Sequence, residues 1–179
     1  ADGRSMLVAG AKGPLQQILR IDLNDGRSTV VAGSQRDTSW RSPGSGTLTQ
    51  PRWLPDGTAC LFVSNSTVER VDLRTGARTT AVTAPTNVQS LAVSPDGVSV
   101  AFIAADSPGA TSRRLIIAQL SDGKMRSVAT INDGTSAKSV TWSADGRFVI
   151  YSDRRAARLV PETTQAYSEL WRVPVAGGE

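Results

Sequence analysis

The chain has 179 residues, of which 20 are basic, 16 are acidic and none is histidine, so its net charge is +4. With 39% hydrophobic and 20% charged residues, the composition is that of a folded globular protein and excludes a disordered one. No apolar run approaches the roughly 20 residues that cross a bilayer as a helix, so we expect no membrane insertion by this segment. A mild positive charge does not indicate a nucleic-acid-binding protein either.

A turn followed by an apolar run recurs along the chain. The clearest copy is Ser-Pro-Asp-Gly at 94–97 with the run 98–104, and similar turns occupy 54–57 and 143–146, while the first residues lie inside a fourth copy. Asp accepts hydrogen bonds from nearby backbone N–H groups and Gly adopts positive φ without steric cost, so both favour a turn. The run after the turn is apolar almost without a break, which predicts a strand covered on both faces.

A second pattern follows each copy of the first one. It is an alternating segment that ends at a glycine, namely Gly26, Gly76, Gly123 or Gly178. The third and fifth positions before the glycine are apolar in every copy, and the sixth is arginine in three copies of four. We interpret this spacing as a strand with one buried and one mostly polar face, ending in a tight hairpin.

Taken in chain order, the two patterns predict four short strands per unit and no helix. The Asp-Gly turns recur every 40–50 residues, which is the period of a β-propeller blade. The sequence therefore predicts an all-β fold, a β-propeller of four-stranded antiparallel blades, in one domain over 1–179 with blade units at 1–32, 48–83, 88–129 and 139–179. The predicted strands are 4–10, 16–23, 27–32, 48–53, 58–64, 67–73, 77–83, 88–93, 98–104, 113–120, 124–129, 139–142, 147–152 and 168–175.

This repeating unit resembles the WD40-like repeat of TolB-type propellers. The resemblance covers essentially the whole chain and is clearest at 91–104, 140–153 and 170–178. The sequence departs from true WD40 repeats because it has neither their Gly-His pair nor their Trp-Asp dipeptide. The resemblance implies a ring of six or seven blades, in a bacterial protein that faces the periplasm or the cell exterior.

The predicted strands amount to about three and a half blades. An open arc of blades would leave apolar faces exposed at both ends, and such faces promote association. We therefore expect either a partial ring, as a fragment of a longer protein, or a ring that a second copy completes as a homodimer.

The composition limits the chemistry that the chain can perform. Without histidine it cannot build a Ser-His-Asp or Cys-His nucleophile system or a His-ligated metal site. Its only cysteine, Cys60, lies inside an apolar strand and is expected in the core. Asp56, Asp96 and Asp145, with Asp2, hold equivalent turns, so we interpret them as turn formers rather than calcium ligands, which must converge. The prediction is a protein that is not an enzyme and has no cofactor or metal site.

The four tryptophans differ in their predicted roles. Trp53 and Trp142 hold the same position in the first strand of a blade and are predicted to pack one blade on another. Trp171 takes a strand position that is apolar in two other copies, so it is predicted in the core. Trp40 lies in a polar connection, where it either fixes the loop or contacts a partner.

The long loops are all predicted at one end of the blades, because the other two turns of each unit are tight. Loops on a rigid scaffold commonly carry binding residues. One interpretation is that the arginines at this end only keep the loops soluble, and the other is a basic face for an acidic protein segment or an anionic glycan. The candidate partner-binding residues are Arg36, Trp40, Arg41, Arg113, Arg114, Arg154, Arg155 and Arg158.

Together these features predict a non-catalytic scaffold for protein–protein or ligand recognition. It would be the sensor or interaction part of a larger bacterial protein in the periplasm or outside the cell. The resemblance keeps an alternative open, the gating propeller of a prolyl-oligopeptidase-like serine peptidase whose catalytic domain is absent here. It also leaves open whether the parent is a kinase, a peptidase or a lipoprotein.

Overall fold

The fold consists of strands and turns in the residues that the structure describes. The computed structural model describes residues 3–12, 15–35, 48–110, 112–131, 139–153 and 169–176. No helix occurs in these ranges, and accordingly none is present there that is long and apolar enough to cross a membrane. The all-β prediction is confirmed.

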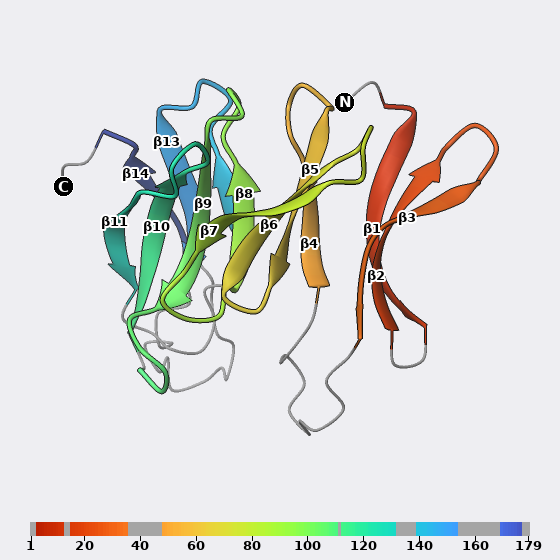
Figure 1. Ribbon diagram of the computed structural model, residues 1–179. Helices are drawn as coiled ribbons and strands as arrows, with labels where there is room; N and C mark the ends of the chain where they lie inside the picture. Colours follow the sequence, from red (N-terminus) through yellow and green to blue (C-terminus); the bar gives the residue numbers. More distant parts are fainter. Residues whose placement is uncertain are drawn as a thin grey trace, which may run out of the picture. The chain divides into compact units, whose positions relative to one another are not determined.

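The described strands form four antiparallel sheets in two compact units, residues 1–84 and 85–179 (Figure 1). Each predicted strand is present, with bounds that agree to within three residues. The N-terminal unit holds a three-stranded and a four-stranded sheet, and the C-terminal unit a four-stranded and a three-stranded sheet. In sheet order the strands are β1 Ser5–Lys12, β2 Leu15–Asp22 and β3 Ser28–Gln35; β4 Leu48–Trp53, β5 Ala59–Ser64, β6 Thr67–Asp72 and β7 Arg78–Thr83; β8 Ser90–Val93, β9 Ser99–Ala105, β10 Arg113–Gln119 and β11 Met125–Ile131; β12 Val140–Trp142, β13 Phe148–Asp153 and β14 Glu169–Pro174.

The repeat extends to the backbone register of the sheets. The pairing of β2 with β3 shifts between Ile18 and Leu19, and that of β10 with β11 shifts between Leu115 and Ile116. The pairing of β6 with β7 shifts at the equivalent place, after Val68. Such a bulge bends and twists the outer strand. Positions counted from the hairpin glycines are therefore structurally equivalent between sheets.

The repeated aspartates build the turns that precede β5, β9 and β13, as predicted. The Oδ1 atoms of Asp56, Asp96 and Asp145 each accept the backbone N–H two residues later, at 3.0 Å. The glycine that follows each aspartate has a φ of about +70°, a left-handed conformation that other residues adopt only with strain. The turns thus depend on both members of each Asp-Gly pair.

In the N-terminal unit the core lies between the two sheets. Ile18 and Ala32 of the first sheet pack against Cys60, Phe62 and Val71 of the second. All five side chains are buried, which confirms the expectation for the only cysteine. Their removal from water drives the two sheets of this unit together.

In the C-terminal unit the core lies between the sheet β8–β11 and the sheet β12–β14. Buried side chains of both sheets form it, with Val128, Trp142, Val173 and others packed at its margin. The buried members are Ala92, Ala101, Ile103, Leu115, Ile117, Ile131, Val140, Val149 and Tyr151.

Both tryptophans of the first blade strands join two sheets of their unit, as predicted. Trp142 donates its indole Nε1–H to the Ala92 carbonyl of β8, at 3.2 Å. The Arg20 guanidinium of β2 lies over the Trp53 ring, 5.8 Å from its centroid. Such a cation–π contact adds to the apolar burial of the ring.

Two predicted core positions are wrong. Trp171 is 36% exposed and the preceding Leu170 is 78% exposed, because β14 is an edge strand among the described residues, whereas its counterparts β2, β6 and β10 each have a further strand beside them. Leu23 is 54% exposed, because in the described part of the N-terminal unit no sheet covers its face of β1–β3.

Candidate functional site

The predicted basic face is described only at Arg113 and Arg114, which begin β10. The Arg114 guanidinium forms an ion pair with the carboxylate of Asp106, and Ser112 donates a hydrogen bond to the same carboxylate at 3.3 Å. Charge at this point of the face is thus partly neutralised. The other candidates lie outside the described residues, so the face stays a prediction: Arg36, Trp40, Arg41, Arg154, Arg155 and Arg158.

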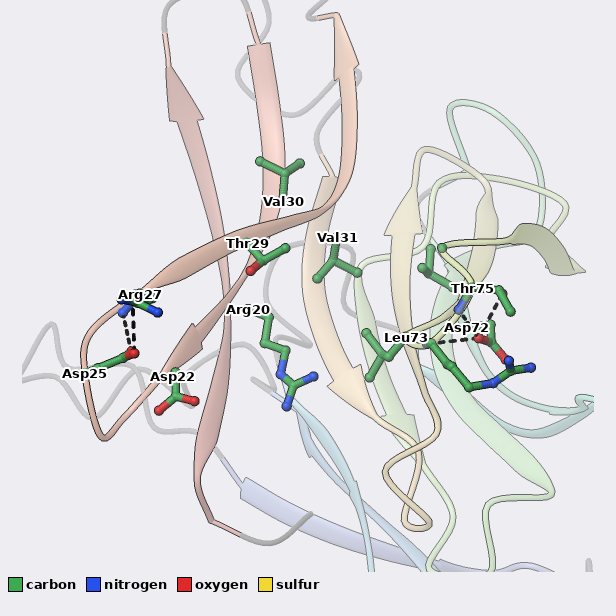
Figure 2. Close-up of a pocket in the computed structure, with 13 residues that line it drawn as sticks. Arg20, Asp22, Asp25, Arg27, Thr29, Val30, Val31, Asp72, Leu73 and Thr75 are labelled. Atoms are coloured by element: carbon green, nitrogen blue, oxygen red, sulfur yellow. Dashed lines mark hydrogen bonds and ion pairs between the residues drawn. The ribbon is translucent and has the colours of Figure 1, made fainter.

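A pocket that the sequence did not indicate lies in the N-terminal unit, at the end of the sheets that carries the tight hairpins. It has a volume of about 510 Å³ and lies between the β2–β3 hairpin and the end of β6 (Figure 2). Its lining residues are Arg20, Asp22, Asp25, Arg27, Thr29, Val30, Val31, Val71, Asp72, Leu73, Arg74, Thr75 and Gly76.

Arg20 is the cation best fixed in this pocket. Its Nε–H donates to the Ser5 hydroxyl at 3.2 Å and its guanidinium lies over the Trp53 ring. Among the described residues, no carboxylate oxygen lies within 4.0 Å of it. Figure 2 shows the guanidinium pointing into the space between the two sheets. Arg20 is therefore oriented by neutral partners, and its charge has no ion-pair partner among the described residues.

The aspartates of the pocket hold its hairpins in shape. Asp25 accepts the backbone N–H of Arg27 at 2.9 Å and pairs with its guanidinium at 3.4 Å. Asp72 accepts the backbone N–H of Thr75 at 2.7 Å and its hydroxyl at 2.8 Å. These hydrogen bonds, the backbone one first, lower the pKa of Asp72 below its ordinary value. Asp25 and Asp72 are thus already engaged with the backbone of their own hairpins.

The floor of the pocket is apolar and continuous with the core of the unit. Val71 is buried in that core, and Val31 and Leu73 pack against it. Above this floor the lining carries three arginines and three aspartates, so its formal charges cancel. The pocket can therefore hold a ligand that is part aliphatic and part polar.

The sequence pattern does not indicate this pocket, because an arginine at the sixth position before the hairpin glycine is typical of a solvent-facing side chain, and Arg20 is exposed. In the C-terminal unit that position is Ile117, which is 3% exposed and belongs to the core. In the N-terminal unit the same position is Arg20. An arginine at a place where the repeat also holds isoleucine was the available signal for a polar site between sheets.

The described residues gather no evident catalytic set. Burial raises the pKa of the Cys60 thiol to about 11, and a thiol of that pKa is a poor nucleophile at neutral pH. In the described ranges, no three His, Cys, Asp or Glu side chains lie close enough to hold a metal ion.

Solved structures with a similar fold include proteins of different activities. An oligogalacturonate lyase in complex with manganese superposes with a TM-score of 0.75 and 18% identity, over 99% of this chain and 48% of that one. TolB from Acinetobacter baumannii gives 0.70 and 19%, over 99% and 42%. A putative TolB from Agrobacterium tumefaciens gives 0.65 and 18%, over 97% and 56%. The chain thus spans about half of each of these structures, and such low identities show the fold alone.

A search of curated protein sequences gives no match. The family model described as the lipoprotein LpqB β-propeller domain matches residues 9–177, which is nearly the whole chain and agrees with the TolB-like sheets. The chain therefore belongs to the LpqB lipoprotein β-propeller domain family, and its fold is that of TolB-like β-propellers.

Proposed function

We propose that this domain is a non-catalytic recognition module of a larger bacterial envelope protein, where it binds a protein partner in the periplasm or outside the cell. The family is named for the propeller domain of a lipoprotein, which supports an envelope location. Rigid antiparallel sheets that present turns and loops at their ends support a role in binding.

The observation that carries the non-catalytic part of this proposal is the geometry of the turn aspartates, since the Oδ1 atoms of Asp56, Asp96 and Asp145 each accept a backbone N–H of their own turn at 3.0 Å. Asp56, Asp72, Asp96, Asp122 and Asp145 all have lowered pKa values, and in each case the largest cause is a hydrogen bond from the aspartate's own turn. A general acid at neutral pH needs a raised carboxyl pKa, which is the opposite shift. The repeated acids therefore serve the scaffold.

The likeness to a lyase favours no second function. At 18% identity it concerns the fold, and the described residues gather no metal-ligand set. Lyase activity is nonetheless a direct way to test the proposal. Incubation of the chain with oligogalacturonate and Mn²⁺ is expected to return the substrate unchanged, and release of unsaturated products would overturn the non-catalytic assignment.

Binding is tested by site-specific photo-crosslinking in the full-length protein within its native envelope. A photoreactive residue placed at Thr29, in the pocket, or at Arg154, on the predicted basic face, is expected to give a discrete product with another protein. Thr79, exposed on β7 and outside the pocket, is the control position. Identical products from all three positions would contradict a defined recognition surface.

A further experiment addresses the predicted basic face by itself. Reversal of Arg154, Arg155 and Arg158 to Glu is expected to weaken capture of an acidic partner and to flatten its dependence on salt, because charge attraction at an exposed face is screened. Unchanged capture would assign these arginines to solubility.

A further inference from the structure

The two units offer an internal comparison, because each places a β-hairpin of one sheet against the end of the next sheet. Alignment on the hairpin glycines, Gly26 and Gly123, makes Arg20 equivalent to Ile117 and Thr29 equivalent to Arg126. The pocket of the N-terminal unit therefore has a counterpart position in the C-terminal unit.

In the C-terminal unit this position is held by an apolar core side chain and an arginine. Ile117 is buried in the core, and Val173 and Val175 pack against that core. The Arg126 side chain crosses from β11 and donates through Nη2 to the Val175 carbonyl just beyond β14. Ile117 and Arg126 thus occupy the two positions that Arg20 and Thr29 hold in the N-terminal unit.

In the N-terminal unit both closing side chains are replaced. Thr29 has a much shorter side chain than Arg126, and Arg20 is charged where Ile117 is aliphatic. The space that remains is the pocket of about 510 Å³. Val31, Val71 and Leu73 still provide the apolar floor, so the difference lies in what covers it.

We propose that this pocket binds a peptide segment of the protein partner, in which one carboxylate stands beside an aliphatic side chain. The carboxylate pairs with Arg20, and the aliphatic group covers Val31, Val71 and Leu73. This rests on the proposed recognition function and gives it a ligand chemistry. The ligand supplies the apolar cover that the equivalent position of the other unit obtains from its own residues.

Arg20 is suited to this role because it is oriented before a ligand arrives. Its contacts with Ser5 and Trp53 involve Nε and the face of the guanidinium, so the two terminal amino groups are available for a bidentate carboxylate. Bidentate pairs are stronger and more directional than single charged hydrogen bonds. Prior orientation also reduces the entropy lost on binding.

The lining favours a peptide over a polyanionic or sugar ligand. Its charges cancel, since three arginines face three aspartates, so several negative charges in one ligand would meet the aspartates as well. A sugar would place hydroxyl groups against the aliphatic floor, where they lose hydrogen bonds to water without replacement. A single carboxylate next to an aliphatic chain matches both parts of the lining.

The test is an NMR titration of the isotope-labelled 179-residue chain with acetyl-Gly-Leu-Glu-Leu-Gly-amide. Its Glu→Gln analogue differs only in the carboxylate, and its affinity is expected to be lower by a factor of about ten or more. Acetyl-Gly-Leu with a free carboxyl end, compared with its amide, shows whether a chain terminus supplies the carboxylate equally well. The expected shifts fall on amides of β2, β3 and the residues after β6.

Two equivalent positions of the chain allow a matched pair of variants for the same titration. Arg20→Ile installs the residue of the other unit. It is expected to lower the affinity for the Glu peptide about tenfold, to a value close to that of the Gln analogue. Arg70→Ile changes the equivalent position of β6, which is exposed and outside the pocket, and is expected to leave binding unchanged. Thr29→Arg installs the bridge of the other unit and is expected to abolish binding.

Equal binding of the Glu and Gln peptides, or equal loss in Arg20→Ile and Arg70→Ile, would overturn the proposal. Larger shifts of the same amides with trigalacturonate than with the peptide would show that the ligand of this pocket is a glycan and not a peptide. If the Arg20→Ile variant does not fold, the comparison of the Glu and Gln peptides on the unmodified chain still tests the proposal. A crosslinked partner without peptide binding would remove this inference and leave the recognition function intact.

Discussion

Each unit holds a boundary between two of its sheets, and these two boundaries differ in the two side chains that cover their apolar floor. In the C-terminal unit Ile117 fills the boundary and Arg126 bridges it to Val175. In the N-terminal unit Arg20 and Thr29 leave an open, charged pocket over an apolar floor. The backbone of the repeat is thus compatible with either arrangement, and the side chains at the boundary decide whether it is apolar and bridged or holds a pocket.

The largest expected effect comes from breaking one core without the other. Phe62→Ala removes a fully buried ring from the N-terminal unit and should cost about 3–5 kcal/mol of unfolding free energy. Cys60 lies in the same core, so its reaction with a thiol reagent reports the opening of this unit. We expect faster labelling of Cys60 in Phe62→Ala.

Ile103→Ala is the matched change in the C-terminal core, with an expected cost of about 2–5 kcal/mol. It should accelerate hydrogen exchange of β9 and β10 and leave the labelling of Cys60 nearly unchanged. Equal acceleration of Cys60 labelling by both variants would show that the two units unfold as one.

The turns differ between the units as well. Ser94 is 2% exposed, donates its hydroxyl to Asp96 at 2.5 Å and accepts the N–H of Ser99 at 2.9 Å, whereas Leu54 holds this place in the N-terminal unit. Ser94→Ala leaves these groups without the hydroxyl and should cost about 1–3 kcal/mol, measured by urea denaturation. Ser143→Ala, at a less buried copy, should cost less, and the reverse order would contradict burial as the cause.

The bridge of the closed boundary is expected to matter less. Arg126→Thr copies the N-terminal arrangement and removes an exposed hydrogen bond, so we expect a loss of about 0.5–1.5 kcal/mol. Hydrogen exchange should increase in β11 and β14 and not in β2 or β3. An unchanged melting temperature and exchange rate would show that Ile117 closes this boundary without the bridge.

The smallest effect concerns pH. The turn aspartates have folded-state pKa values below the ordinary 3.8, so the stability they contribute is present above that pH and is lost as the pH falls further through the folded values. We expect the urea concentration at the midpoint of denaturation to decrease as the pH is lowered below about 4. Asp96→Asn should make that fall shallower, and an unchanged slope would exclude Asp96 as a contributor.

Much of the fold follows from the sequence because its causes are local. An aspartate that binds the N–H two residues later and a glycine at positive φ fix each turn without help from distant residues, so the turns at Asp56, Asp96 and Asp145 were predicted correctly. The apolar runs after them predicted buried strands for the same reason. Trp171 was placed wrongly because its burial depends on a strand beside β14.

The pocket depends on residues that are distant in the chain. Arg20 of β2 and Leu73 after β6 come together only when two sheets pack on each other. The sequence of either segment does not indicate which of its faces the adjacent sheet covers. The alternation in β2 predicts a polar face turned to solvent, although Arg20 of that face lies on the side of the next sheet. By itself the sequence determined the strands, the turns and the repeat, because hydrogen bonding and hydrophobic patterning act over a few residues. Only the tertiary structure decided which boundary holds the pocket, because that depends on the shapes and charges of side chains from two sheets.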